Sequence, residues 1–363
     1  MLNVSKGLTK AVVTFLLIIG PCLHRIAPQS LQIEYADRDR GIKLYQQGDM
    51  EAALKALRIG TQKFKDDGIA WHYIGLSLNH KGDLKGARKA FENATRLRPD
   101  FVPSLSALAH ILLLSNKTNE AEDEANRALS LDRQNAEGHY VIGVIRTQQR
   151  SCGEALAHAD AALNSNSSFS LAYLLKSQAI ICDLAESSLK PWVFDGTTFK
   201  TSSAAEISKE QKIAKMKKDG LRFAEAAEYL ERFLQQSSTT LDHETWAAQL
   251  EALRIHAQPA NETDKERTVF SGAEVTTKLR MLSKPEPTYT HSAKAAGVEG
   301  TVVLRAVFAE DGTVKSVLIL NPLPNGLTER AIQAAKKIKF TPATKDGRLV
   351  STYVQLEYNF NLY

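Results

Sequence analysis

The chain has 363 residues, of which 43% are hydrophobic, enough to build packed cores in two or three domains. Disorder over most of the chain is therefore excluded. The net charge of +5 arises from 46 basic and 41 acidic residues spread along the sequence, which is too weak and too dispersed to indicate nucleic-acid binding.

The first predicted element is a targeting segment in residues 1–30. Lys6 and Lys10 precede an apolar run over residues 11–23. This run fits the apolar core of a signal peptide, about 7–15 residues, but is shorter than the roughly 20 residues that span a bilayer. The sequence therefore favours export with removal of the segment, and leaves open an uncleaved anchor in residues 11–23.

An internal repeat with a period of 34 residues occupies most of the remaining chain. Small residues recur at two matched positions of each unit: Gly41, Gly75, Ala109, Gly143 and Ser177, and again Ala53, Ala87, Ala121 and Ala155. Each unit is expected to be an antiparallel pair of helices, with small residues where the backbones approach and large ones between units.

The second unit carries the fullest pattern, Trp71-x-x-Ile74-Gly75-x-x-Leu78 followed by Gly82, Ala87, Phe91, Ala94 and Pro99. This pattern resembles the tetratricopeptide repeat (TPR), and the resemblance covers roughly residues 34–240. We therefore predict a TPR α-solenoid of about five helix pairs within residues 31–257. The units are placed near residues 34–67, 68–101, 102–135, 136–169 and 170–240.

The fifth unit is predicted to contain an insertion at about residues 187–219. Its first half has the composition of a loop, whereas residues 204–218 favour a helix. A last amphipathic segment, residues 242–258, is predicted to form a capping helix that closes the open end of the stack.

The resemblance implies a concave face, lined by the first helix of each unit, on which peptides usually dock. By register, the candidate contact residues on this face are Tyr35, Arg38, Ile42, His72, Leu76, Asn79, Ser106, His110, Tyr140 and Thr147. This mixture lacks the cluster of Lys, Arg and Asn that would hold a terminal carboxylate. The groove is therefore expected to bind a protein or peptide whose sequence the residues do not identify.

Only Cys152 and Cys182 follow the N-terminal segment, and they form no Cys-x-x-Cys pair for zinc or redox chemistry. Two interpretations stay open. The simpler one is a pair of small buried side chains. The other is a disulfide, because stacking of the units brings both residues towards the same edge and an oxidising compartment would allow a bridge.

Residues 258–285 are predicted to be a polar linker, because helical periodicity stops there and the run Asn261-Glu-Thr-Asp-Lys-Glu-Arg267 is polar throughout. Such a linker has few apolar residues to bury. The modules on either side are therefore expected to move relative to each other.

In residues 286–363 an alternation of apolar and polar residues replaces the helical period. Strands are predicted over residues 301–308 and 313–320, separated by a turn at Glu310-Asp311-Gly312. A helix over 327–337 and a final strand over 351–361 complete a ββαβ domain. The fold class is thus mainly α, with a small α+β domain at the C-terminus.

This segment resembles the C-terminal domain of the TonB family through Pro287-x-Tyr289, Gly297-Val298-x-Gly300-Thr301-Val302, Asp311-Gly312-x-Val314, Ile338-Lys-Phe340-x-Pro342-Ala343 and Gly347-x-x-Val350. The resemblance implies a periplasmic domain that engages outer-membrane β-barrel transporters by pairing with an extended segment at their N-terminus. Energy-transducing members also have an N-terminal membrane helix and a proline-rich spacer. This chain has a short apolar segment and a repeat array instead, so partner recognition is expected and energy coupling is in doubt.

The final strand is predicted to lie at the edge of a three-stranded sheet, where unpaired backbone groups form a template for an extended partner. Its exposed register places Tyr353, Gln355, Glu357 and Asn359 against the partner, while Val354, Leu356 and Tyr358 are buried. The alternative is that the linker or a second copy of the domain covers this edge.

Catalytic motifs are missing from the sequence: the nine histidines form no His-Glu-x-x-His pair, and no nucleophile elbow or phosphate-binding glycine loop is present. We therefore predict a non-enzymatic binding protein without cofactor or metal. One candidate function is a TonB-type transport component whose arm recruits another protein. The other is a periplasmic scaffold without energy coupling, and retention or removal of the N-terminal segment distinguishes the two.

Overall fold

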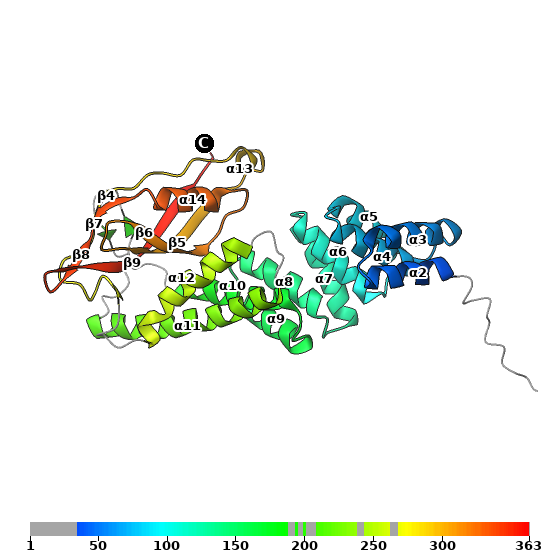
Figure 1. The fold of residues 1–363 in the computed structure, drawn as a ribbon, viewed down its shortest axis with the longest axis horizontal. Coiled ribbons are helices and arrows are strands. Elements are labelled where there is room, and N and C mark those ends of the chain that lie inside the picture. The colour runs from blue at the N-terminus through cyan, green and yellow to red at the C-terminus, as the bar shows by residue number, and fades with distance from the viewer. Residues whose placement is uncertain are drawn as a thin grey trace, which may run out of the picture.

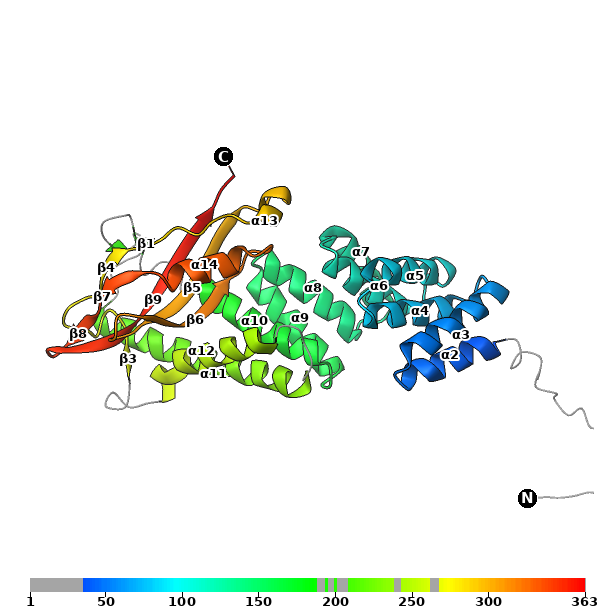
Figure 2. The ribbon, with the colours of Figure 1, turned by 45° about the horizontal axis from the view of Figure 1, so that its top comes forward.

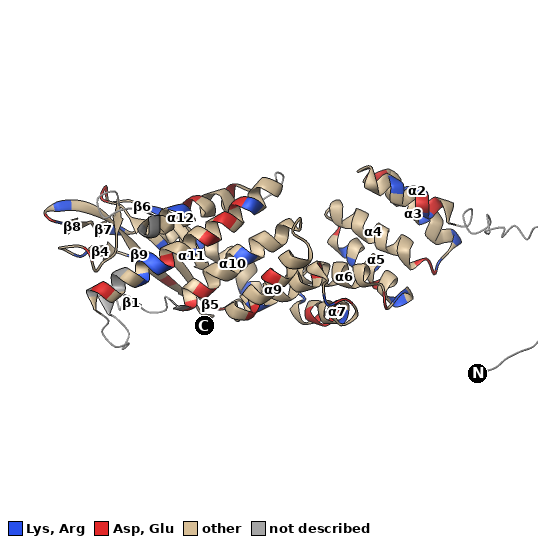
Figure 3. Ribbon diagram, turned by 90° about the horizontal axis from the view of Figure 1, so that it is seen from below, with Lys and Arg blue, Asp and Glu red and all other residues tan. Residues whose placement is uncertain are grey.

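The computed structural model describes residues 35–187, 193–194, 199–200, 208–237, 243–261 and 268–362, and the targeting segment predicted in residues 1–30 lies outside them. A long arm of stacked helices ends against a domain that contains a β-sheet (Figure 1). Basic and acidic residues lie interspersed along the arm (Figure 3). In the described residues, no helix is both long enough and apolar enough to cross a membrane.

The outer part of the arm consists of antiparallel helix pairs. They are α2 (Ala36–Gln46) with α3 (Met50–Lys63), α4 (Gly68–His80) with α5 (Leu84–Leu97), α6 (Val102–Leu114) with α7 (Thr118–Leu131), and α8 (Ala136–Gln148) with α9 (Cys152–Ser165). This confirms the predicted α-solenoid.

Small residues lie where the two helices of a pair cross. A Cβ atom on Gly75 would lie 2.6 Å from the ring of Phe91, and one on Gly41 would lie 2.5 Å from the side chain of Leu57. The second helices of the first two pairs begin at capped positions, since Asp49 and Asp83 each accept a hydrogen bond from a backbone N–H of the following turn. The 34-residue spacing of small residues therefore follows directly from how closely the helices pack.

The inner part of the arm has longer helices. After α10 (Ser170–Ser187), the two-residue strands β1 (Val193–Phe194) and β2 (Phe199–Lys200) pair antiparallel. Helix α11 (Lys209–Gln236) starts with a capping box between Ser208 and Gln211, and α12 (His243–Asn261) follows. The helical half of the predicted insertion and the second helix of the fifth unit are thus one continuous helix.

The C-terminal domain has more strands than the predicted ββαβ pattern. One sheet has the order β3 (Val269–Phe270), β9 (Arg348–Phe360), β5 (Gly300–Phe308) and β6 (Val314–Asn321), and β8 (Ala343–Lys345) also pairs with β9. A second pair joins β4 (Arg280–Ser283) to β7 (Lys339–Thr341). The helices are α13 (His291–Ala295) and α14 (Leu327–Ala335).

The sheet is covered on both faces. On one face Leu304, Leu356 and Tyr358 pack with α14 in an apolar core. On the other face Val303, Leu318 and Leu320 join one buried apolar cluster with residues of α10, α11 and α12. The two modules also lie against each other in both views of the ribbon (Figures 1 and 2).

The predicted mobility between the modules is therefore wrong. The segment expected to be a linker, residues 258–285, contains the end of α12 and the strands β3 and β4. The side-chain amide of Gln249 on α12 bonds the backbone of β6, donating to Val317 O at 3.1 Å and accepting from Ile319 N at 3.0 Å. Shared apolar burial and paired polar groups hold the arm and the sheet together.

Candidate partner-binding surfaces

Strand β9 is internal in the sheet at its start and an edge strand later on. One side pairs with β5 from Thr352 to Phe360. The opposite side pairs with β3 at residues 351–352, and β9 also pairs with β8 over residues 348–350. Beyond these, no strand in the described part of the chain pairs with residues 354–360 on that side. We call residues 354–360 of β9 the free edge.

Two hydrogen bonds show which backbone groups of the free edge point outwards. Thr301 O accepts from Asn321 Nδ2, so the backbone of Thr301 points towards β6 and away from β9. Thr301 lies opposite Asn359, so the backbone groups of Asn359, and of Glu357 two residues earlier, point away from β5. Glu357 O accepts from Lys284 Nζ at 2.8 Å. Successive residues of a strand direct their backbone N–H and C=O groups to alternate sides. The groups of Gln355, Glu357 and Asn359 therefore all point outwards.

The side chains predicted on the free edge have different surroundings. Gln355 Nε2 donates to Glu357 Oε1 at 3.3 Å, and Asn359 Oδ1 accepts from Thr301 Oγ1 at 2.7 Å. Leu356 and Tyr358 are buried, whereas Val354 is only half-buried. Gln355, Glu357 and Asn359 therefore lie together along the edge, with the buried residues on the opposite face.

Tyr353 is not an exposed partner contact as predicted, because it joins the sheet to the arm. Its hydroxyl donates to Ile255 O at 2.8 Å, and its ring centroid lies 5.1 Å from that of His256. The predicted exposed register is therefore wrong at Tyr353, because this face of the sheet is not open there.

A cluster of rings and one guanidinium forms the joint between the modules. The Arg305 guanidinium lies 5.0 Å from the ring centroid of Phe223 on α11 and 5.1 Å from that of Tyr353. Burial lowers the pKa of Arg305. His256 is fully buried and its Nδ1 donates to Ala252 O at 2.8 Å, while burial and then the nearby Arg305 lower its pKa to about 3.

Sequence reasoning missed this joint, although β5 carries a signal for it. Both of its registers carry large apolar residues, with Val302 and Leu304 on one face and Val303 and Val307 on the other. A strand that is apolar on both faces indicates cover on both faces.

On the repeat arm, the first predicted concave residues lie on units one and two. The Arg38 guanidinium lies 4.2 Å from the ring centroid of Tyr35 and pairs with Asp39 at 2.9 Å. His72 is buried and hydrogen-bonds Ser104 Oγ at 3.0 Å, and burial lowers its pKa to about 4. The remaining residues of this set are half-buried: Ile42, Leu76 and Asn79.

On units three and four, the predicted residues meet around Glu137, which the sequence did not single out. Ser106 Oγ donates to Glu137 Oε2 at 3.0 Å, and His110 Nδ1 lies 3.4 Å from Glu137 Oε1. The ring centroid of Tyr140 is 5.4 Å from that of His110, and burial raises the pKa of Tyr140 to about 12. Thr147 instead donates to Gly143 O of its own helix.

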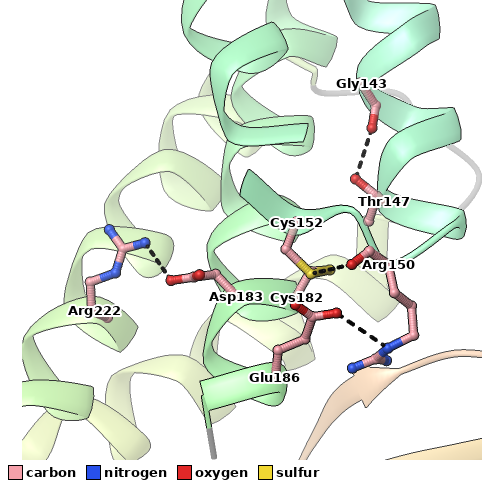
Figure 4. Close-up of a disulfide and its surroundings, with 8 residues drawn as sticks. All are labelled: Gly143, Thr147, Arg150, Cys152, Cys182, Asp183, Glu186 and Arg222. Atoms are coloured by element: carbon pink, nitrogen blue, oxygen red, sulfur yellow. Dashed lines mark hydrogen bonds and ion pairs between the residues drawn. A yellow bond between two sulfur atoms is a disulfide. The ribbon is translucent and has the colours of Figure 1, made fainter. Parts of the chain in front are cut away.

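Cys152 and Cys182 form a disulfide, the second of the two interpretations left open by the sequence. Their Cα atoms are 5.5 Å apart and both residues are buried. The bridge joins the start of α9 to α10, and ion pairs Arg150–Glu186 and Arg222–Asp183 flank it (Figure 4). No group of three or more His, Cys, Asp or Glu residues suited to a metal ion occurs within the described ranges.

Family models match both modules. The tetratricopeptide repeat model matches residues 38–100 and 78–145, and the model of the Gram-negative bacterial TonB protein C-terminal matches residues 285–362. Both families are protein-interaction modules.

Curated relatives match parts of the chain. Protein TonB of Pseudomonas aeruginosa is 26% identical over 85 residues, covering 23% of this chain and 25% of that protein. Human Protein O-mannosyl-transferase TMTC3 is 30% identical over 131 residues, covering 34% of this chain and 14% of that protein. The chain thus spans a quarter or less of the curated relatives it matches.

Among solved structures, PilW, described as a widely conserved type IV pilus biogenesis factor, is 14% identical with a TM-score of 0.42. The match covers 63% of this chain and 89% of that chain. Taken together, the family matches and the fold show that the chain joins an array of tetratricopeptide repeats to a C-terminal domain of the TonB type.

Proposed function

We propose that this protein is a non-enzymatic adaptor of the bacterial periplasm whose free edge on β9 pairs with an extended N-terminal segment of an outer-membrane β-barrel transporter. The observation that carries the proposal is the row of outward backbone groups at Gln355, Glu357 and Asn359, in a domain that the TonB model matches. Such a row is a template for one further strand.

Main-chain hydrogen bonds along the free edge would supply affinity, and alternate side chains would supply selectivity. The side chains of Gln355, Glu357 and Asn359 are the contacts we assign to the partner on the face away from α14. Tyr353 is excluded from this set because its hydroxyl is bonded to Ile255 O.

The repeat arm would hold a second protein on its concave face. The residues that support this role are the half-buried Leu76 and Asn79 on α4 and the half-buried His110 and Tyr140 near Glu137, whereas Ser106 is fully buried beneath them. The apolar residues 11–23 would direct export, and if retained they would tether the protein to the inner membrane.

A second candidate is a scaffold that binds both partners without transmitting energy. The contact between α12 and β6 favours it, because a fixed joint sets a constant distance between the concave face and the free edge. Sequencing the N-terminus of the mature protein from membrane and soluble envelope fractions distinguishes the candidates, since an untethered protein cannot transmit force from an inner-membrane motor.

The test is site-specific photo-crosslinking in the cells that make the protein. p-Benzoylphenylalanine replaces Gln355 on the free edge or, as a control, the exposed Gln333 on α14. The proposal expects cross-links from position 355 that map by mass spectrometry to the N-terminal segment of an outer-membrane β-barrel. Equal cross-linking from position 333, or none from position 355, contradicts it.

A further inference from the structure

Residues 284–289 cross β9 near its C-terminal end, and we call them the crossing segment (Figures 1 and 2). At its start, Lys284 Nζ donates to Glu357 O at 2.8 Å and lies 4.5 Å from the ring centroid of Tyr358. At its end, the ring of Tyr289 meets that of Phe360 edge-on at 5.4 Å. Both ends of the segment are thus anchored on the last four residues of β9.

The crossing segment lies beside the free edge but is unsuited to pair with it as a strand. Pro285 and Pro287 have no backbone N–H to donate, so two of its six residues leave any ladder incomplete. The bond to the outward carbonyl of Glu357 comes instead from a side chain, the ammonium of Lys284.

Glu357 is the middle one of the three outward-pointing residues of the free edge. A strand added there must donate a backbone N–H to Glu357 O in either a parallel or an antiparallel arrangement. The ammonium of Lys284 occupies this acceptor at hydrogen-bond distance. A partner that pairs along the whole free edge therefore competes with Lys284.

We propose that Lys284 is a latch on the free edge, which an extended partner must displace from the Glu357 carbonyl before it pairs along residues 354–360. This inference rests on the proposed strand addition and concerns how that site is regulated. Placing a lysine on an exposed edge is also a general way to prevent unwanted strand pairing.

The surroundings of Lys284 allow its bond to Glu357 O to break when a partner binds. The bond to a carbonyl and the contact with the Tyr358 ring hold the ammonium in place. Burial opposes them and lowers the pKa of Lys284, because the charged group has lost part of its hydration. The released side chain regains that hydration, which offsets part of the lost contact. The latch thus discriminates between partners without closing the site to all of them.

We predict that removing the ammonium of Lys284 strengthens partner binding. In Lys284→Met the side chain keeps its apolar stem against Tyr358 but has no donor for Glu357 O. We expect about tenfold tighter binding, which corresponds to about 1.4 kcal/mol. Lys336→Met is the matched control, because Lys336 is an exposed lysine of the same domain at the end of α14.

The experiment uses the full chain with p-benzoylphenylalanine at position 355 and measures the cross-linked fraction while the outer-membrane partner is limiting. A several-fold rise in Lys284→Met but not in Lys336→Met supports the latch. An unchanged or reduced fraction in Lys284→Met overturns it while leaving the proposed function standing. No cross-link in the wild-type chain overturns the proposed function and the latch together.

A second measurement on the wild-type chain guards against a folding defect in the variant. N-hydroxysuccinimide acetate labels lysines with and without outer membranes isolated from the cells that make the protein. If Lys284 acts as a latch, its acetylation should rise several-fold when outer membranes are added, whereas the acetylation of Lys336 should stay constant. Unchanged or reduced acetylation of Lys284 contradicts it.

Discussion

His256 shows how one buried residue makes the joint between the modules sensitive to pH. Its pKa of about 3 lies below the ordinary value of 6.5, because burial and the nearby Arg305 disfavour the charged ring. As the pH falls, His256 is therefore protonated in the unfolded chain before it is protonated in the folded chain. The contribution of the neutral His256 ring to the free energy of unfolding is complete above pH 6.5 and is lost progressively between pH 6.5 and about 3.

We predict that this histidine alone lowers the free energy of unfolding by about 2 kcal/mol between pH 7.5 and 5. His256→Gln should reduce the pH dependence by that amount, measured by denaturant unfolding at both pH values. His291→Gln, at an exposed position, should leave the pH dependence unchanged. An equal pH dependence in wild type and His256→Gln would show that His256 does not contribute.

Gln355 gives the second prediction at this scale. Its backbone N–H points away from β5, so proline at this position removes an outward donor without breaking the bonds between β9 and β5. Gln355→Pro should weaken partner binding roughly tenfold while the melting temperature changes by only a few degrees. Gln355→Ala, which keeps the N–H, should bind nearly as wild type, and a folded Gln355→Pro with undiminished binding would rule out the edge.

Among the elements, the disulfide between α9 and α10 fixes the start of the inner arm. Reducing it frees a loop defined by a sequence separation of 30 residues. The chain-entropy argument then gives a loss of about 3–4 kcal/mol in the free energy of unfolding. We predict this loss for wild type in dithiothreitol and for the double variant Cys152→Ala/Cys182→Ala.

The double variant is also the control, because it should no longer respond to dithiothreitol. Denaturant unfolding followed by circular dichroism measures both. A wild-type chain whose unfolding is the same with and without the reductant would mean that the bridge adds no stability.

The elements also show which features the sequence predicts and which it does not. Helix pairs follow from the recurrence of residues such as Gly75, because only a small side chain fits against Phe91. Long strands follow from alternation. By contrast, β3 has only two residues and no periodicity of its own, so its pairing with β9 is set by tertiary packing. Glu137 was missed because it lies 31 and 27 positions from Ser106 and His110 in the sequence, and only the packing of α6 against α8 brings them together.

For the whole molecule, the distinctive feature is the fixed joint between arm and sheet. A linker that looks polar in sequence suggested independent modules, but Leu253 on α12 is fully buried in one cluster with Leu318 and Leu320 on β6. The free edge of β9 stays available to a partner in this arrangement. The arm packs against part of the sheet face opposite α14, at Val303, Leu318 and Leu320.

We predict that Leu253→Asp separates the modules, because an unpaired carboxylate in an apolar cluster costs several kcal/mol. Calorimetry should show two transitions in place of one, and small-angle scattering should show a larger radius of gyration. Leu221→Asp is the control, since Leu221 on α11 is 60% exposed. Unaltered scattering from a folded Leu253→Asp would mean that this cluster does not hold the modules together.

The most direct test of an available strand edge is residue-resolved hydrogen exchange of the full chain, with and without outer membranes from the cells that make it. We predict fast exchange at the amides of Gln355 and Asn359 and slow exchange at Leu356 and Tyr358, whose amides bond β5. Adding outer membranes should protect the fast amides selectively. Uniform protection of β9 in the free protein, or fast amides that outer membranes leave unchanged, would contradict the claim that this edge is the partner site.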